Sequence, residues 1–374
     1  MKEIEIKEVN THKELKEFVD FPFQLYNGNA YWCPPLKANE INTLRKDKNP
    51  AFDFCEARYW IAYQNNKPVG RIAGIINHNE IKYWNSRLVR FGWIDFINDI
   101  EVSRSLLETV KDWGKSKGMT GIHGPLGFTN MDAEGMLIEG FDEISAMSAI
   151  YNFPYYVDHM QNLGFHKATD WIQYEINIPS EIPDKVDRIT RVVLQKYNLH
   201  LLKPRKAKEV VPYATKLFTL YNTAFKNIYG FTALTGKQMD YYTKLYLGFI
   251  RPGFVSLVVD AQDDIVGFAI TIPSLSRALQ KANGSLFPFG FIHLLYALRK
   301  NNVVTMYLMG VRPDFQGKGL LALIYHEMNK VYLKAGITIA RTHPQIEENL
   351  KAISIWKNYD ARLNIRRRCW ALDF

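Results

Sequence analysis

The sequence predicts an α/β protein made of two tandem halves, each with a mixed sheet flanked by helices. Three observations lead to this prediction. The chain has 374 residues, a length that suits two domains better than one. Both halves show the same order of hydrophobic patterns, indicating strand, helix, hairpin, strand, helix, strand, helix and strand. Two prolines within five residues, Pro179 and Pro183, mark a boundary. The expected domains are therefore residues 1–178 and 179–374.

Turn and cap residues delimit the elements of the first half. Thr11 and Glu14 have the spacing of a capping box at the start of the first helix. Asn65 and Asn66 indicate a hairpin, and Gly118 is suited to end a helix. The predicted strands are residues 4–9, 58–64, 69–77, 88–95, 121–124 and 171–178, and the predicted helices are residues 11–25, 99–117 and 154–163.

The second half repeats these patterns. A hairpin is expected around residues 261–263, and Gly336 is placed to end a helix. The predicted strands are residues 254–260, 264–272, 303–311, 337–342 and 362–370, and the predicted helices are residues 210–224, 320–334 and 347–358.

Residues 274–301 form an apolar, helical insertion in the second half. Its composition fits three roles: a cover for an acyl pocket, packing against the first half, or a contact in a homodimer. We expect packing inside the protein. The alternative is a helix lying on a membrane surface, favoured by Arg277, Lys281 and Arg299.

Composition excludes several classes of protein. The net charge of +9 favours anionic partners, but Lys and Arg are spread along the chain, so no clear nucleic-acid site is predicted. The three cysteines are far apart and form no CxxC, so neither a zinc site nor a disulfide framework is expected. No apolar run reaches the roughly 20 residues of a membrane-spanning helix. The N-terminus alternates in charge, unlike a signal peptide, and we expect a cytoplasmic protein.

A glycine-rich turn separates the strand at residues 303–311 from the helix at residues 320–334. The first N–H groups of a helix have no internal partner and, with the helix dipole, attract anions. Glycines let the backbone approach a phosphate closely. The residues expected to bind a phosphorylated cofactor are Gly310, Val311, Gln316, Gly317, Lys318, Gly319, Leu320 and Leu321.

The stretch from Val311 to Gly319 resembles motif A of the GNAT acyltransferase superfamily, whose signature is Gln/Arg-x-x-Gly-x-Gly/Ala. Gln316 and Gly319 match the first two signature positions, whereas Leu321 departs from the third. The resemblance implies that backbone N–H groups here hold the pyrophosphate of acetyl-CoA or another acyl-CoA. It also implies two tandem GNAT-like (acyl-CoA N-acyltransferase) domains, each with a mixed, mostly antiparallel sheet.

Residues 347–359 resemble motif B of the same family. Asn349 matches the asparagine that contacts the CoA arm in relatives. The tyrosine that serves relatives as general acid is replaced here by Trp356. Tyr359 is the nearest tyrosine. In a continuous helix it would lie about 300° around the axis from Trp356. It could therefore take this role only if the helix ended or shifted locally. Core packing is the alternative for both side chains. Glu347, Glu348 and His343 lie close to the expected cleft in the sequence, and any of them could act as general base through water.

The first half departs from the family at its phosphate loop. Residues 96–103 contain no glycine and carry Asp99 and Glu101, so we do not expect CoA to bind there in the usual way. Polar and aromatic side chains after its strands are the candidates for binding an acceptor substrate, with core packing as the alternative. They are Asn130, Tyr151, Asn152, Tyr155 and Tyr156.

The resemblance implies an enzyme that transfers an acetyl or other acyl group from acyl-CoA to an amine, with backbone stabilisation of the oxyanion near Gly310 and Val311. Two alternatives stay open. One is a transferase of tandem GNAT fold that uses aminoacyl-tRNA. The other is a protein that binds CoA or another ligand without catalysis.

Overall fold

The computed structural model describes residues 3–147, 149–181 and 184–374, which form two compact units. The first unit comprises residues 1–172, 276–293 and 364–374, and the second comprises the remainder. Both are discontinuous in sequence, because part of the insertion and the last strand belong to the first unit. The predicted linker at residues 179–183 lies partly outside the described residues. The predicted division into residues 1–178 and 179–374 stays a prediction.

The first unit contains a mixed sheet in the order β1–β2–β3–β4–β5–β14, and β6 also pairs with β14. β4 and β5 are parallel, whereas the pairs β1–β2, β2–β3, β3–β4, β5–β14 and β6–β14 are antiparallel. The strands are β1 (Glu5–Glu8), β2 (Cys55–Gln64), β3 (Lys67–Asn77), β4 (Leu88–Phe96), β5 (Gly121–Gly124), β6 (Met136–Glu139) and β14 (Ala361–Asp373).

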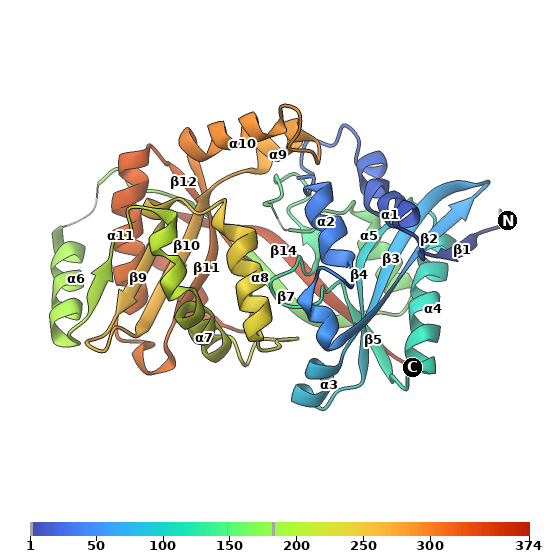
Figure 1. The fold of residues 1–374 in the computed structure, drawn as a ribbon, viewed down its shortest axis with the longest axis horizontal. Helices are drawn as coiled ribbons and strands as arrows, with labels where there is room; N and C mark the ends of the chain where they lie inside the picture. Colours follow the sequence, from blue (N-terminus) through green and yellow to red (C-terminus); the bar gives the residue numbers. More distant parts are fainter. Residues whose placement is uncertain (1–2, 148, 182–183) are drawn as a thin grey trace. The chain divides into compact units, whose positions relative to one another are not determined.

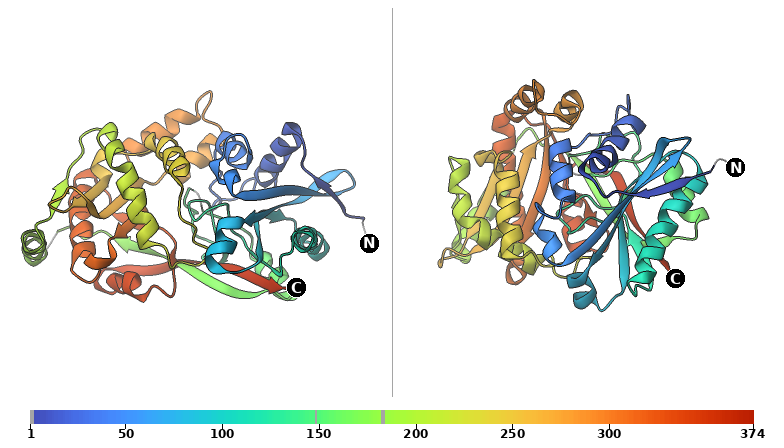
Figure 2. Two further views of the ribbon diagram at one scale, coloured as in Figure 1. Left: turned by 60° about the horizontal axis from the view of Figure 1, so that its bottom comes forward. Right: turned by 45° about the vertical axis from the view of Figure 1, so that its right-hand side comes forward.

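Helix α4 joins the parallel strands of the first unit and packs on its sheet (Figures 1 and 2). Val102, Leu106 and Val110 recur on one side of α4 and are fully buried, as a helix with one apolar face requires. The capping box of α1 is confirmed: the N–H of Glu14 donates to Thr11, and the N–H of Thr11 donates to the Glu14 carboxylate. The helices are α1 (His12–Leu25), α2 (Lys37–Leu44), α3 (His78–Trp84), α4 (Ile100–Ser116), α5 (Tyr155–Asn162) and α9 (Ser276–Ala282).

The second unit repeats the arrangement with the order β7–β12–β11–β10–β9–β8, and β13 pairs with β7. β11 and β12 are parallel and are joined by α11, whereas the pairs β7–β12, β10–β11, β9–β10 and β8–β9 are antiparallel. The predicted mixed, mostly antiparallel sheets are thus confirmed. The strands are β7 (His166–Asn177), β8 (His200–Leu202), β9 (Val255–Val259), β10 (Ile265–Pro273), β11 (Val303–Val311), β12 (Ile339–Thr342) and β13 (Gln345–Ile346).

Helix α11 packs on the second sheet and α6 lies beside α11 (Figure 1). Gly336 ends α11 in the left-handed conformation, with φ of 73°, as predicted. The helices are α6 (Asp184–Lys196), α7 (Ala214–Ala224), α8 (Gly236–Leu247), α11 (Leu320–Ala335) and α12 (Leu350–Ile353), and α10 (Gly290–Arg299) has residues 290–293 in the first unit and the rest in the second.

The prediction of one helix over residues 347–358 is wrong. Asn349 caps a single turn, α12, and a 3-10 helix follows over Ser354–Asn358. Tyr359 then has extended backbone, with φ of −124° and ψ of 158°. The sequence analysis also missed several elements, which are α2, α3, α6, α8, β6, β8 and β13.

The insertion at residues 274–301 forms α9 and α10 rather than one long helix. The expectation of interior packing is correct for one face only: Leu279 and Leu294 are buried. It is wrong for the segment before α10 and for the other face of α10, where Phe287 is 78% exposed and Tyr296 is 61% exposed.

Candidate functional site

The turn that leads from β11 into α11 is held by one arginine. Arg312 donates to Asp314 at 2.8 Å and to Asp260 at 2.9 Å, and its backbone N–H donates to Val266 at 2.8 Å. Beyond it, Gly317 and Gly319 have φ of 75° and 82°, conformations that favour glycine. The sequence therefore builds a fixed turn that ends at the first residue of a helix.

The N-terminus of α11 has the features of an anion site. Gly319 is its N-cap and has no side chain to accept the first N–H groups, and the first turn has no acidic residue. Gln316, Gly317, Lys318 and Gly319 are exposed. The Lys318 ammonium lies over the rings of Tyr197 and Phe315, at 5.4 and 5.2 Å from their centroids, which adds a full positive charge beside the helix end.

Helix α4 of the first unit begins differently. Asp99 is its N-cap, and the Asp99 carboxylate accepts the N–H of Glu101 at 3.0 Å. At the end of the preceding strand, the N–H of Phe96 donates to Tyr156 at 2.9 Å. The equivalent anion position in this unit is thus occupied by the chain's own side chains and carries negative charge.

A pocket of about 560 Å³ lies beside the α11 N-terminus within the second unit. Its walls come from the end of β7 and the chain after it, from α6, from α11, and from the 3-10 helix and the segment after it. Ile189, Val193, Leu323 and Ile355 make much of it apolar, and Gly319 and Tyr359 also line it. The pocket can therefore receive an extended ligand that has both an anionic group and an apolar portion.

Tyr359 reaches this pocket because the last helix ends before it. Burial raises the pKa of the Tyr359 phenol above its ordinary value of about 10. The hydroxyl therefore stays protonated at neutral pH and can donate a proton. Trp356, by contrast, is buried in the core, and its indole N–H donates to Gln345 at 3.0 Å.

On the edge that faces away from β10, the last residues of β11 before the turn are not paired with β12. β12 pairs with β11 only as far as Met306 and Thr342. The N–H of Arg312 points to β10. Because strand residues alternate, the N–H of Gly310 also points to β10, whereas those of Met309 and Val311 point to the open edge. The sequence predicted that the backbone near Gly310 and Val311 stabilises the oxyanion. Of these two residues, Val311 directs its N–H to the open edge of β11. Met309, which does the same, was not predicted.

The other predicted cofactor and catalytic residues lie around this region. Leu320 is buried in the core and Leu321 packs against it, so only their backbone is available to an anion. The Asn349 side chain accepts the N–H of Ala352 at 3.3 Å and is used as a helix cap. Glu347 is half-buried, and it does not line the pocket.

Helices α6 and α11 are joined by a charged contact at the pocket wall. Asp187 Oδ1 lies 2.8 Å from His326 Nε2 and 2.7 Å from Lys330 Nζ. Hydrogen bonds from Lys330 and His326 lower the pKa of Asp187 to about 2. His326 is buried and lines the pocket. No sequence motif pointed to this contact, because α6 was not predicted.

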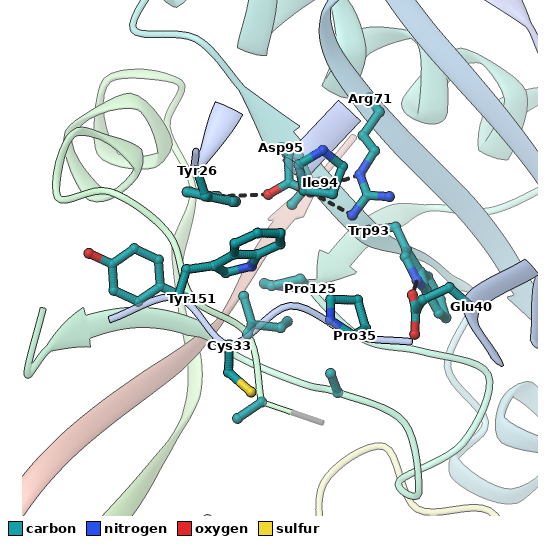
Figure 3. A pocket seen from close by; sticks show the side chains of 15 residues that line it. Tyr26, Cys33, Pro35, Glu40, Arg71, Trp93, Ile94, Asp95, Pro125 and Tyr151 are labelled. Carbon is teal, nitrogen blue, oxygen red and sulfur yellow. Dashed lines mark hydrogen bonds and ion pairs between the residues drawn. The ribbon is translucent and has the colours of Figure 1, made fainter. Parts of the chain in front are cut away.

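The predicted substrate residues of the first unit have different surroundings. Tyr156 is fully buried, and Asn152 is buried with its amide bonded to the backbone of Leu137. Tyr155 donates to Phe96 at 2.6 Å. Asn130 is half-buried and donates to Glu134 at 3.3 Å. Tyr151 lines a cavity, which is small, about 120 Å³, and lies within the first unit (Figure 3).

The cavity of the first unit contains residues that the sequence analysis did not select. Tyr26, Trp32, Trp93 and Tyr151 contribute aromatic rings, and Glu40 contributes a carboxylate (Figure 3). These side chains come from α1, the following loop, α2, β4 and the loop before α5. No local pattern joins them, so only the fold brings them together.

Comparison with known proteins gives two relatives in sequence, and no protein-family model matches the chain. Protein YghO of Escherichia coli (strain K12) is 28% identical over 310 residues, which cover 81% of this chain and 77% of YghO. The bacterial ceramide synthase of Caulobacter vibrioides (strain NA1000 / CB15N) is 27% identical over 312 residues, 82% of this chain and 80% of that protein.

Among solved structures, a tandem GNAT protein from the clavulanic acid biosynthesis pathway superposes with a TM-score of 0.59. The match covers 99% of this chain and 98% of that one, at 12% sequence identity. Both units of the chain are therefore included in the match, which agrees with one parallel strand pair and one crossover helix in each. The chain has the tandem GNAT fold.

Proposed function

We propose that the protein is an N-acyltransferase that binds acyl-CoA in the second unit and transfers the acyl group to an amine. The observation that carries this proposal is the uncapped N-terminus of α11 at Gly319, which opens onto the 560 Å³ pocket that Tyr359 also lines. The pyrophosphate would bind the backbone N–H groups of the turn and of the first residues of α11, Leu320 and Leu321, whereas the N–H of Lys318 donates to Phe315 at 3.2 Å. Lys318 would add charge attraction.

The reaction is direct attack of the neutral amine on the thioester carbonyl carbon. The C–N bond forms, the C–S bond breaks, and the CoA thiolate takes a proton from the Tyr359 hydroxyl. The oxyanion accepts hydrogen bonds from backbone N–H groups on the open edge of β11, at Met309 and Val311. The ammonium loses its extra proton to water or to a base such as Glu347.

Long acyl chains and long-chain amines are included among the proposed substrates. A ceramide synthase forms an amide between a fatty acyl group and a long-chain amino alcohol, and a relative with this name is 27% identical. The apolar wall made by Ile189, Val193, Leu323 and Ile355 is suited to an alkyl chain. Acetyl-CoA is the short-chain alternative.

The proposal is tested by measuring release of free CoA thiol from acetyl-CoA and palmitoyl-CoA with a panel of primary amines. Amine-dependent release by the parent, reduced in Lys318→Glu, is the expected result. The matched control is Lys208→Glu, which reverses the charge of an exposed lysine elsewhere in the second unit. Binding of acyl-CoA without release by any amine would contradict the catalytic part of the proposal.

A further inference from the structure

The small cavity of the first unit contains a carboxylate without a cation. Glu40 accepts the indole N–H of Trp93 at 2.7 Å, and among the described residues no lysine or arginine forms an ion pair with it. Arg71 is the nearest cation in the cavity wall, but its guanidinium is bound to Asp95 at 2.7 Å (Figure 3). Burial raises the pKa of Glu40, whereas the Trp93 hydrogen bond and the charge of Arg71 lower it.

The Asp95 carboxylate, by contrast, has a cationic partner. It accepts the Tyr26 hydroxyl at 2.7 Å and is paired with Arg71, whose remaining guanidinium N–H donates to the backbone of Phe18 at 2.9 Å. The Arg71–Asp95 pair is therefore neutral as a unit. The charged side chains that line the cavity are Glu40, Arg71 and Asp95, so an ionised Glu40 leaves one negative charge there.

Aromatic rings surround the same space. The Tyr26 ring lies 5.3 Å from that of Trp32 and 5.7 Å from that of Tyr151. Tyr151 is held by hydrogen bonds with Asn29 and Phe141, each at 3.2 Å. Aromatic faces attract cations, and this attraction is stronger where water is excluded.

The backbone of Trp93 has an energetically unfavourable conformation. Its φ is 44°, which is unusual for a bulky residue, and it lies at an irregularity in the pairing of β3 with β4. Strained residues of this kind persist where surrounding structure holds them, and they cluster at functional sites. Here the strained residue places its indole N–H on Glu40.

We propose that this cavity binds the ammonium group of a primary amine, with Glu40 as counter-ion and Tyr26, Trp32 and Tyr151 as aromatic walls. A volume of about 120 Å³ fits a head group and the first carbons of a chain. This inference goes beyond the proposed function. Binding itself requires no acyl-CoA.

The test uses n-butylammonium chloride as probe, observed by saturation-transfer NMR without CoA. Butan-1-ol is the neutral control of equal length. The expected result is saturable binding of butylammonium, weak binding of butanol, and at least a tenfold loss of butylammonium affinity in Glu40→Gln. The amide can still accept the Trp93 N–H, so the variant preserves the local geometry. Glu108→Gln, at an exposed carboxylate of the same unit, is the matched control with unchanged affinity.

Equal binding of butanol and butylammonium, or unchanged affinity in folded Glu40→Gln, would overturn the ammonium site. A separate titration with acetyl-CoA distinguishes this failure from failure of the proposed function, because Glu40 and the α11 N-terminus belong to different units.

A second inference rests on the exposed apolar side chains around α10. Six apolar or aromatic side chains within ten residues are exposed, and we call them the 287–296 patch: Phe287, Phe289, Phe291, Ile292, Leu295 and Tyr296. Single exposed apolar residues are ordinary, but a contiguous group marks an interaction surface. Phe287 and Phe289 are 78% and 69% exposed.

The charged residues that flank the 287–296 patch in the sequence have one sign. Arg277, Lys281, Arg299 and Lys300 are exposed, and residues 265–313 contain no Asp or Glu. Exposed aromatic and aliphatic side chains with flanking cations complement a bilayer surface that carries anionic headgroups. We infer that the 287–296 patch docks on anionic membranes.

Flotation with vesicles of phosphatidylglycerol and phosphatidylcholine tests this surface, with pure phosphatidylcholine vesicles for comparison. The protein is expected to float with the anionic vesicles, less so at high salt, and the double variant Phe287→Ser/Phe289→Ser is expected to stay behind. Tyr83→Ser/Trp84→Ser removes another exposed aromatic pair, on α3, and should float like the parent. Absence of flotation, or a concentration-dependent dimer that the Phe287→Ser/Phe289→Ser variant abolishes, would overturn the inference.

Discussion

Val193 Cγ2 lies 3.2 Å from the position that a Cβ atom at Gly319 would occupy. Helix α6 therefore packs directly against the first residue before α11, at the mouth of the 560 Å³ pocket. Because Gly319 also has φ of 82°, both the backbone and the neighbouring side chain favour glycine at this position. The same glycine leaves the helix N-terminus uncapped for an anion.

Gly319→Ala is expected to lower the free energy of unfolding by about 1–2 kcal/mol, the usual cost of a left-handed conformation for a residue with Cβ, and to weaken acyl-CoA binding. Urea unfolding measures the first effect. Gly317→Ala is the control, since its φ of 75° is similar but a Cβ atom there meets nothing within 4 Å. Equal losses of acyl-CoA affinity in both variants would mean that the Val193 contact has no part in binding.

Tyr359→Phe is expected to reduce kcat about 100-fold, in the range of general acid catalysis, with little change in acyl-CoA affinity. Because burial raises the pKa of Tyr359, the parent should lose activity through this group only above about pH 10. The pH profile of kcat measures both. An unchanged kcat in Tyr359→Phe would remove Tyr359 from the mechanism.

Glu80→Ala is expected to destabilise the first unit by about 3–5 kcal/mol, because it leaves the buried guanidinium of Arg90 without its counter-ion. The two side chains are 2.7 Å apart and 6% and 1% exposed. Arg90 also donates to Gly127 at 2.8 Å, so the loop after β5 should loosen. Glu8→Ala, which breaks the exposed pair with Arg58, should cost less than about 1 kcal/mol in the same urea experiment.

Asp187→Asn is expected to weaken the packing of α6 on α11 in a pH-dependent manner. The pKa of Asp187 is about 2 in the folded protein, below the ordinary value of about 3.9. Its contribution to stability is therefore present above about pH 4 and is lost as the pH falls towards 2. Urea midpoints of the parent and Asp187→Asn should converge across this window. A constant difference from pH 6 to pH 2 would contradict the assignment.

The sequence predicted the fold because its strongest signals are local. The capping box at Thr11, the hairpins and the left-handed Gly336 each depend on neighbouring residues, and the structure has all of them. The turn at Gly317 and Gly319 was found for the same reason. Helix α6 was not predicted, although it is strongly amphipathic. It directly follows the two prolines that were taken as the domain boundary.

The parts of the site that depend on distant contacts could not be predicted. Glu40 and Trp93 come from different elements, and the positive φ of Trp93 leaves no mark in the sequence. The role of Tyr359 depended on where the last helix ends, which the helical periodicity of residues 347–358 predicted incorrectly. The aromatic residues near 151–156 were recognised as a group, but the fold buries Tyr156 and places Tyr151 at a cavity.

The central claim, that acyl-CoA binds at the N-terminus of α11, is tested most directly by calorimetric titration of acetyl-CoA and palmitoyl-CoA into the parent, Lys318→Glu and Lys208→Glu. The account predicts saturable binding at one site in the parent and in Lys208→Glu, and at least a tenfold weaker affinity in folded Lys318→Glu. No binding of either acyl-CoA or of free CoA to the parent, or equal affinity in all three proteins, would contradict it.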